Sequence, residues 1–411
     1  MKKHGRVYLL IAILSAFYLL VAYAIGFFAR PDFYLTQFAP DSESYLQVSD
    51  WLFRGASNLV IQRRTFLYPL LVGLARIPFG NLGIWLMQML FWLASAVIFF
   101  LNLESALPSR RGRYLVFILF CLVLSPIYLS LTVLTESTAF FLFALIGYFF
   151  IQSLRGRGEH TLPAVLVCTG CLTMIKPNYN PAFMALLALA PLAKWRGRIR
   201  LTWPALALTF AIAFLPTMIQ MGFFWHQTSR LGLSSMSKEV IQLTFYPEMV
   251  AKLQHRDVLD VRPAIIQANP TMASMLNFAL EHPMTAVACL IRNIEENLRD
   301  VLHLDADPVW ERYWRNVLND IFYWIHVAFI APILWLLWHL RAWREFRDIS
   351  LTMMVILFWI ALATTGLAFW AGDRYTVPFL PLWPLIYITV VSRIVAIYRA
   401  QTKSMAAGAP P

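Results

Sequence analysis

The chain has 411 residues, of which 59% are hydrophobic and only 14% are charged. A soluble protein of this length needs far more polar surface, so the composition excludes an ordinary soluble fold. The formal net charge is +12. The basic residues are spread along the borders of apolar segments and not gathered in one patch, which argues against a nucleic-acid partner.

Apolar runs of about 18 or more residues predict membrane-spanning helices. We expect an all-α polytopic membrane protein with about ten spans and both termini in the cytoplasm. The expected spans lie near residues 7–28, 82–102, 114–134, 137–154, 161–175, 179–193, 201–222, 321–340, 350–370 and 377–398. The first run loosely fits a cleavable signal peptide, but it continues through Phe28, and we expect an uncleaved helix.

The order of the spans divides the chain into three parts. Residues 1–222 form an N-terminal transmembrane module whose first outer loop is 29–68, and residues 66–79 are too short and proline-rich to span, so we expect a re-entrant or interfacial helix there. Residues 223–320 form an outer, periplasmic segment with helical patterns at 273–280 and 286–299. Residues 321–411 form a C-terminal transmembrane module and a cytoplasmic tail.

Three acidic residues stand in outer turns where a loop needs only small polar residues. Asp41 and Glu43 lie in the first outer loop, and Glu136 lies in a tight turn between two apolar runs. A positioned carboxylate can take the proton from an attacking hydroxyl or amine, so all three are catalytic candidates. The alternatives are that Asp41 caps a helix, that Glu43 faces solvent and that Glu136 complements a helix dipole.

Four basic residues share these outer turns. Arg63 and Arg64 end the first loop, Lys176 follows the fifth expected span, and Arg374 lies in the last outer turn. Fixed positive charge stabilises a phosphate leaving group, which makes these four candidates for binding a donor phosphate. The alternative is that their long side chains reach toward lipid headgroups.

Four further residues in the same turns are candidates for binding substrate: Tyr45, Tyr68, Asp373 and Tyr375. The tyrosines are equally suited to an aromatic belt at the membrane surface. Carboxylate oxygens suit Mg²⁺ or Mn²⁺, so Asp41 and Glu136 could hold a divalent cation, although the sequence does not require one.

The pattern resembles the GT-C superfamily of integral-membrane glycosyltransferases, in the branch with protein O-mannosyltransferases and the bacterial transferases that put aminoarabinose on lipid A. The resemblance covers roughly residues 1–200 and 320–398. The matching motifs are Pro40-Asp41-Ser42-x-Ser44-Tyr45, Arg64-Thr65-Phe66-Leu67-Tyr68-Pro69, Leu134-Thr135-Glu136, Ile175-Lys176-Pro177 and Gly372-Asp373-Arg374-Tyr375-x-x-Pro378-x-x-Pro381.

The resemblance implies a GT-C-like fold, a polyprenyl-phosphate sugar donor and a catalytic acid in the first outer loop. Carried over to this sequence, Asp41 is the general base, Glu136 is a second acidic site residue, and Arg374 with Lys176 contacts the lipid phosphate. Many relatives have two adjacent acids in the first loop, whereas Ser42 follows Asp41 here. We also expect no counterpart of the large soluble C-terminal domain of some relatives.

Two other functions remain open. A lipid-linked glycan polymerase, ligase or flippase needs similar basic outer turns but not the acid of the first loop. A secondary transporter predicts charged residues near the middle of the membrane in related halves, and no such halves are visible. The sugar and the acceptor (a glycolipid, a glycan or a protein) are not specified by the sequence, and we expect the protein in a bacterial inner membrane.

Overall fold

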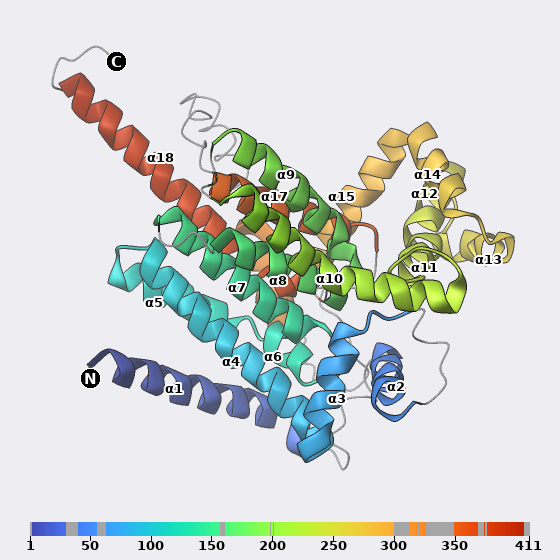
Figure 1. Ribbon diagram of the computed structural model, residues 1–411, viewed down its shortest axis with the longest axis horizontal. Helices are drawn as coiled ribbons and strands as arrows, with labels where there is room; N and C mark the ends of the chain where they lie inside the picture. The colour runs from blue at the N-terminus through green and yellow to red at the C-terminus, as the bar shows by residue number, and fades with distance from the viewer. Residues whose placement is uncertain are drawn as a thin grey trace.

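The computed structural model describes residues 2–29, 40–55, 63–156, 161–197, 199, 201–299, 313–318, 320–321, 323–325, 349–368, 374 and 376–406. Within these ranges every regular element is a helix and no strand occurs. The longer helices run broadly along one direction, and the shorter helices α11–α14 gather at one end (Figure 1). The fold class expected from the sequence, an all-helical protein, is therefore confirmed for this part of the chain.

The N-terminal module begins with α1 (Lys2–Ala24) and continues through the first outer loop. Its elements are α2 (Pro40–Arg54), α3 (Leu67–Phe79), α4 (Asn81–Ala106), α5 (Arg110–Leu122), α6 (Ser125–Ser130), α7 (Glu136–Leu154), α8 (Thr161–Ile175), η4 (Pro177–Tyr179), α9 (Asn180–Trp195) and α10 (Trp203–Thr228). The helix α7 packs between α4 and α8, and α10 packs against α8. An added Cβ at Gly170 in α8 would lie 2.2 Å from the Ala213 carbonyl oxygen in α10, so only glycine permits this close approach.

The segment expected on the outer side, 223–320, which we call the outer segment, consists of short helices and their connections where the structure describes it. It contains α11 (Met236–Val240), the π-helical turn η5 (Ile241–Phe245), α12 (Tyr246–Gln254), α13 (Val258–Ala268), α14 (Met272–Glu281) and α15 (Pro283–Arg299). The last two include the helical patterns expected at 273–280 and 286–299. The C-terminal part supplies α17 (Ile349–Thr365), η8 (Val377–Phe379) and α18 (Trp383–Ala406).

Four of the described helices contain stretches long and apolar enough to cross a membrane: Gly5–Ala24, Asn81–Ala106, Glu136–Leu154 and Trp203–Thr228. Their lengths indicate a helical membrane protein. The expected spans at 161–175, 179–193 and 350–370 correspond to the shorter helices α8, α9 and α17. Most of the expected span at 321–340 lies outside the described residues.

The single helix expected over 114–134 is wrong. The chain forms α5, which ends at Leu122, and then the separate short helix α6 from Ser125. Pro126 explains the break, because a proline ring clashes with the carbonyl group four residues earlier and cannot donate to it. That carbonyl belongs to Leu122, where α5 ends.

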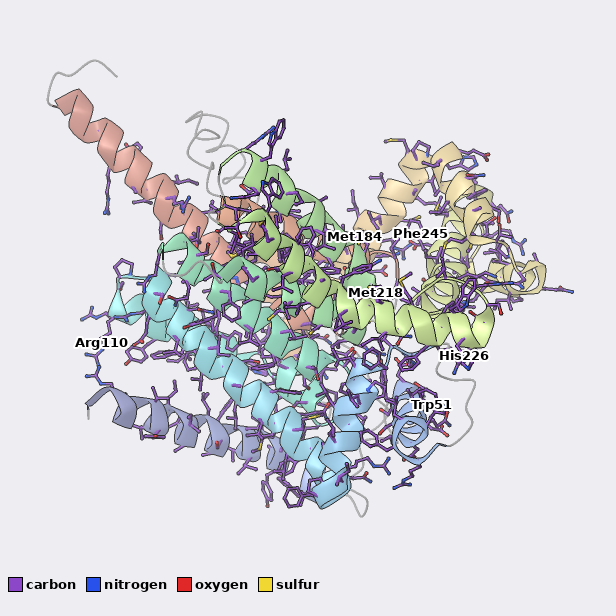
Figure 2. The ribbon with its side chains drawn as sticks, in the orientation of Figure 1. Trp51, Arg110, Met184, Met218, His226 and Phe245 are labelled. Atoms are coloured by element: carbon purple, nitrogen blue, oxygen red, sulfur yellow. The ribbon has the colours of Figure 1, made fainter. Side chains whose placement is uncertain are left out.

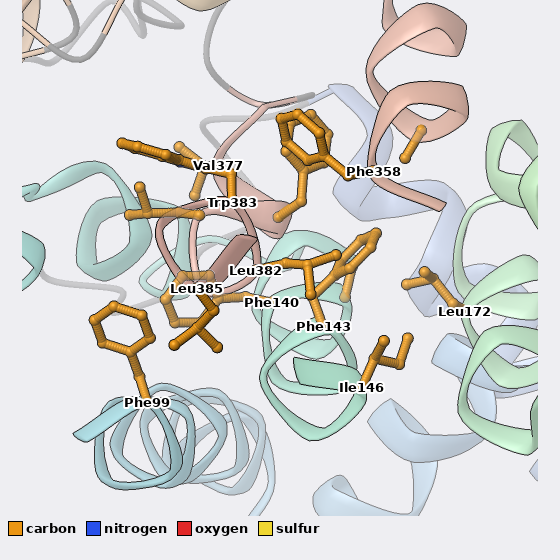
Figure 3. Close-up of a cluster of buried hydrophobic side chains, with 14 of the residues drawn as sticks. Phe99, Phe140, Phe143, Ile146, Leu172, Phe358, Val377, Leu382, Trp383 and Leu385 are labelled. Carbon is orange, nitrogen blue, oxygen red and sulfur yellow. The ribbon is translucent and has the colours of Figure 1, made fainter. Parts of the chain in front are cut away.

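A continuous apolar core joins the N-terminal helices to α17, η8 and α18. Figure 3 shows Phe140 and Phe143 of α7 beside Phe358 of α17 and the side chains around η8. The ring of Phe379 lies 5.9 Å from that of Phe143 and 5.7 Å from that of Phe358, both edge to face. This packing fixes η8, and with it the preceding turn that carries Arg374, against the first half of α7.

The two ends of the bundle differ in what they carry. Figure 2 shows Arg110, the first residue of α5, at one end, and Trp51 of α2 and His226 of α10 at the opposite end. The basic residues that follow Arg110 lie in the first turn of the same helix. The helix α2 and the C-terminal end of α10 therefore lie at the end of the molecule opposite the basic turn at the start of α5.

Candidate functional site

Asp41 lies in the first turn of α2, which begins at Pro40, so it is not the cap of a helix that begins after it. Its two carboxylate oxygens accept hydrogen bonds from different guanidinium groups, Oδ1 from Arg64 and Oδ2 from Arg374. Burial raises the pKa of the Asp41 carboxyl, but the charges of Arg374 and Arg64 outweigh burial and hold this pKa well below its usual range. Asp41 is therefore an ionised carboxylate at physiological pH.

Arg64 fixes the first turn of α2 to the end of the first loop. Its Nε donates to Ser44 Oγ at 2.8 Å and its Nη1 donates to the Tyr45 hydroxyl at 3.3 Å, in addition to its bond with Asp41. The guanidinium carbon also lies 4.7 Å from the centre of the Tyr45 ring. Arginine alone offers this set of donors on one rigid plane, so lysine cannot replace it.

Glu136 is the first residue of α7 and is 1% exposed. Its Oε1 accepts from Lys176 Nζ at 2.8 Å and from Arg374 Nε at 2.6 Å, and its Oε2 accepts from the Thr135 hydroxyl at 3.3 Å. A buried carboxylate persists only when cations and hydrogen bonds compensate for lost hydration. Glu136 thus holds two cations on a single oxygen atom.

Arg374 connects the two carboxylates, because its Nη2 donates to Asp41 and its Nε donates to Glu136. Lys176 Nζ also lies 3.3 Å from the Arg374 carbonyl oxygen. We call Asp41, Arg64, Glu136, Lys176 and Arg374 the charged cluster. Its three cationic and two anionic side chains leave a net charge of +1.

Four of the five members of the charged cluster line a cavity of about 310 Å³. Asp41, Arg64, Lys176 and Arg374 line it together with Arg63, Tyr45 and Asn178. The remaining lining is mostly apolar and comes from the start of the outer segment, from α17 and the residues after it, and from the turn after α8: Met236, Val240, Ile241, Leu367, Ala368, Ile175, Pro177 and Pro181. The lining of the cavity therefore combines four cationic side chains and one anionic side chain with residues that are mostly apolar.

The other residues expected at the site lie in different surroundings. Glu43 is exposed and accepts a hydrogen bond from Gln47 of the same helix at 3.0 Å, outside the charged cluster. Arg63 lies at the rim of the cavity, with its side chain 61% exposed and 3.4 Å from Glu239. Asp373 and Tyr375 lie outside the described residues.

Tyr68, which we expected to contact substrate, is fully buried and does not line the cavity. Its hydroxyl donates to Gln88 Oε1 at 3.1 Å, and its ring meets the Tyr45 ring edge to face at 5.0 Å. Tyr45 lies between Tyr68 and Arg64. Tyr68 thus supports the cavity wall from behind.

Two buried asparagines that the sequence did not single out hold the segment before Arg374. Asn297 of α15 donates to the carbonyl oxygens of Thr365 at 3.0 Å and Ala368 at 2.8 Å, and Asn293 donates to the Gly366 carbonyl oxygen at 3.0 Å. These carbonyls lie at the C-terminal end of α17, where a helix has no internal donors left. The outer segment therefore fixes the end of α17, and Leu367 and Ala368 of the cavity with it.

Gln220 makes a comparable link in the N-terminal module. In α10 its Oε1 accepts from the Phe66 backbone N–H at 3.0 Å, and its Nε2 donates to the Leu233 carbonyl oxygen at 2.8 Å. Gln220 is fully buried. It joins the end of the first loop, which carries Arg64, to the beginning of the outer segment. A lone glutamine inside an apolar run is the signal that could have identified it.

The carboxylates of the charged cluster do not fit a divalent cation in this arrangement. Both oxygens of Asp41 and Oε1 of Glu136 accept from arginine or lysine, so the positions a metal would take hold cationic groups. No group of three or more His, Cys, Asp or Glu side chains with metal-binding geometry occurs among the described residues. In the charged cluster, arginine and lysine side chains neutralise the two carboxylates.

No family model, no curated protein and no solved structure matches this chain.

Proposed function

We propose that this protein is a GT-C-type glycosyltransferase that moves a sugar from a polyprenyl-phosphate donor to an acceptor at the outer face of a membrane. The observation that carries the proposal is a cavity whose lining combines four members of the charged cluster with mostly apolar residues. A lipid-linked sugar phosphate has matching chemistry, because its anionic phosphate lies between a polar sugar and an apolar chain. The net charge of the cluster, +1, complements a phosphodiester that carries one negative charge.

The proposal includes a topology. Ten spans, with both termini in the cytoplasm, put the basic turn at Arg110 inside and the charged cluster outside, in keeping with the positive-inside rule. We assign the protein to a bacterial inner membrane. No nucleotide sugar is available on the outer side of such a membrane, so the sugar has to arrive on a lipid. The acceptor is a glycolipid, a glycan or a protein.

In the proposed reaction, Asp41 takes the proton from an acceptor hydroxyl while the hydroxyl oxygen attacks the anomeric carbon. The bond between that carbon and the phosphate oxygen breaks, and polyprenyl phosphate leaves with the bonding electron pair. Arg374 and Lys176 stabilise the negative charge that develops on the phosphate. One displacement at one carbon inverts its configuration, by the same stereochemical logic as in glycosidases.

The contacts of Asp41 imply that the donor binds before Asp41 takes the proton. With both oxygens bound to Arg64 and Arg374, Asp41 is a weak base, because a carboxylate with a lowered pKa gains little by taking a proton. A donor phosphate that binds Arg374 competes with Asp41 for the guanidinium group. Donor binding then frees one oxygen of Asp41 and raises its pKa, so the base becomes effective only when the donor is in place.

The test uses purified protein in liposomes with synthetic polyprenyl-phosphate sugars that carry a label in the sugar. Breakage of the sugar–phosphate bond, measured as release of polyprenyl phosphate together with labelled product in the presence of membrane-extract acceptors, supports a transferase. Movement of intact donor across the bilayer without bond breakage supports a flippase and contradicts the proposal. Extension of a lipid-linked chain from a diphosphate donor supports a polymerase instead.

A further inference from the structure

The last helix of the outer segment, α15, turns a polar face inward. Cys289, Asn293 and Asn297 are its buried residues, and their spacing of four places them on one side of the helix. Asn293 and Asn297 bind carbonyl oxygens at the end of α17, and Asn293 also donates to Glu248 of α12 at 2.8 Å. The inward face is polar because its partners are unpaired carbonyls and a carboxylate.

A second face of α15 is an apolar stripe. Met284, Val287, Ile291, Ile294 and Leu298 follow one another at spacings of three, four, three and four residues, which aligns them along the helix. Ile294 and Leu298 pack against the main apolar core of the bundle. Toward the N-terminus the same stripe is uncovered, with Met284 81%, Val287 50% and Ile291 59% exposed.

The exposed part of the stripe continues into the preceding helix. In α14, Leu276 is 53% exposed and Leu280 is 77% exposed. Arg292 and Glu296 lie on a different side of α15, where they pair at 2.8 Å and Arg292 has 66% of its side chain exposed. A helix surrounded by water turns its apolar side inward, so the exposed leucines and their neighbours need a non-aqueous partner.

The position of the stripe identifies this partner. Its covered end, at Ile294 and Leu298, rests on the same core that contains the membrane-spanning helices α4 and α7. Ile294 also lies beside Gly366, at the end of the apolar helix α17, and the exposed end of the stripe continues from there along the same side of α15. From Ile291 to Met284 it extends about 10 Å along the helix. A stripe that continues outward from a membrane-embedded core meets the lipid that surrounds that core.

We propose that α14 and α15 form an interfacial anchor whose stripe (Leu276, Leu280, Met284, Val287 and Ile291) lies in the outer leaflet of the membrane. An amphipathic helix in the plane of a membrane buries its apolar side at the level of the headgroups and first methylenes and keeps its charged side in water. Through Asn293 and Asn297 the anchored helix holds the end of α17. This inference rests on the topology proposed above, which sets the outer leaflet, and not on the proposed reaction.

The test places an environment-sensitive fluorophore on single cysteines in the full-length protein. The starting variant replaces Cys121, Cys168, Cys171 and Cys289 by alanine, and its unfolding temperature is compared with that of the wild type. Val287→Cys and Ile291→Cys probe the stripe, with Met284→Cys as a well-exposed third position. Arg292→Cys is the matched control on the charged side of the same helix. Each labelled protein is reconstituted into vesicles of phosphatidylcholine and phosphatidylglycerol.

Quenching by a lipid with a nitroxide near the headgroup is compared with quenching by iodide in water. We expect lipid quenching at 287 and 291 to exceed that at 292 by at least about twofold, and iodide quenching to show the opposite order. Equal lipid quenching at all positions overturns the proposal and indicates a stripe in water. Weak quenching by both agents at 287 and 291 also overturns it and indicates a protein partner or a second copy of the chain.

Discussion

Glu136 is the most deeply buried member of the charged cluster, and its loss removes the carboxylate that two cations share. Its Oε1 accepts from both Lys176 and Arg374, and its side chain is 1% exposed. In Glu136→Gln both cations remain in a buried site without their shared carboxylate. In Lys176→Met, Glu136 keeps Arg374 at 2.6 Å and Thr135 at 3.3 Å, so no buried charge is left alone.

These contacts predict different losses in unfolding free energy for the two variants. A buried charge left without its partner costs about 3–5 kcal/mol, which is the loss in unfolding free energy expected for Glu136→Gln. Loss of one charge-assisted hydrogen bond costs about 2 kcal/mol, which is the loss expected for Lys176→Met. In the double variant the lysine that the first substitution isolates is absent, so the combined loss falls short of additivity by about 1–3 kcal/mol.

The assay is equilibrium unfolding in mixed micelles, followed by far-ultraviolet circular dichroism while the fraction of denaturing detergent is raised. Asp50→Asn is the control, because Asp50 of α2 lies outside the charged cluster and pairs with Arg76 of α3 at 3.1 Å. The reasoning is refuted if Lys176→Met costs as much as Glu136→Gln, or if the two losses add in the double variant.

Three further predictions concern the same site. Since the folded pKa of Asp41 is lowered, its contribution to stability is complete above its unfolded pKa of about 3.9 and is lost as the pH falls through the folded value. The difference in unfolding free energy between wild type and Asp41→Asn is therefore flat from about pH 5 to 8 and shrinks only in stronger acid; a change centred near pH 6.5 contradicts this. In Arg374→Lys one positive charge remains but cannot reach both Asp41 and Glu136, so we expect the donor KM to rise about tenfold. In Arg374→Gln the charge is lost, and we expect the donor KM to rise about a hundredfold. Equal KM values in the two variants would contradict this order. Asn297→Ala leaves the Thr365 and Ala368 carbonyls unpaired and lowers the unfolding free energy by about 2–3 kcal/mol, with a larger change in donor KM than in kcat; an unchanged KM argues against a positioning role.

The helices of the bundle were largely predictable from the sequence, because apolar runs of this length have few alternatives to spanning helices. The outer helices α14 and α15 were also found from their periodicity. The break between α5 and α6 was missed because hydropathy continues across it, although Pro126 marks it by sterics alone. A count of apolar residues takes no account of the steric clash between a proline ring and the backbone carbonyl four residues earlier.

The members of the charged cluster were also visible as candidates. Charged side chains at the ends of apolar runs are costly, and Asp41, Glu136 and Arg374 lie in turns that require no charge. Their pairing was not predictable, since Arg374 is 238 positions from Glu136 and 333 from Asp41 and the pairing depends on how η8 packs against α7. The difference between exposed Glu43 and clustered Asp41, two residues apart on one helix, also follows from tertiary packing and not from residue type.

The buried amides could not be recognised from the sequence. Asn293 and Asn297 occur among charged residues in an amphipathic pattern, where polar residues are normally assigned to the water side. Only their contacts with the carbonyls at the end of α17 reveal that the polar side faces inward. The same inversion leaves the apolar stripe of α15 on the outside.

The measurement that tests the central claim most directly is release of polyprenyl phosphate from a labelled donor by purified Asp41→Asn protein, with Asp50→Asn beside it. Both substitutions exchange an aspartate for its isosteric amide on α2, but only Asp41 belongs to the charged cluster. The account predicts that Asp41→Asn lowers the turnover rate by at least about a hundredfold while Asp50→Asn stays within about threefold of the wild type. Equal turnover by wild type and Asp41→Asn would contradict the assignment of Asp41 as the base.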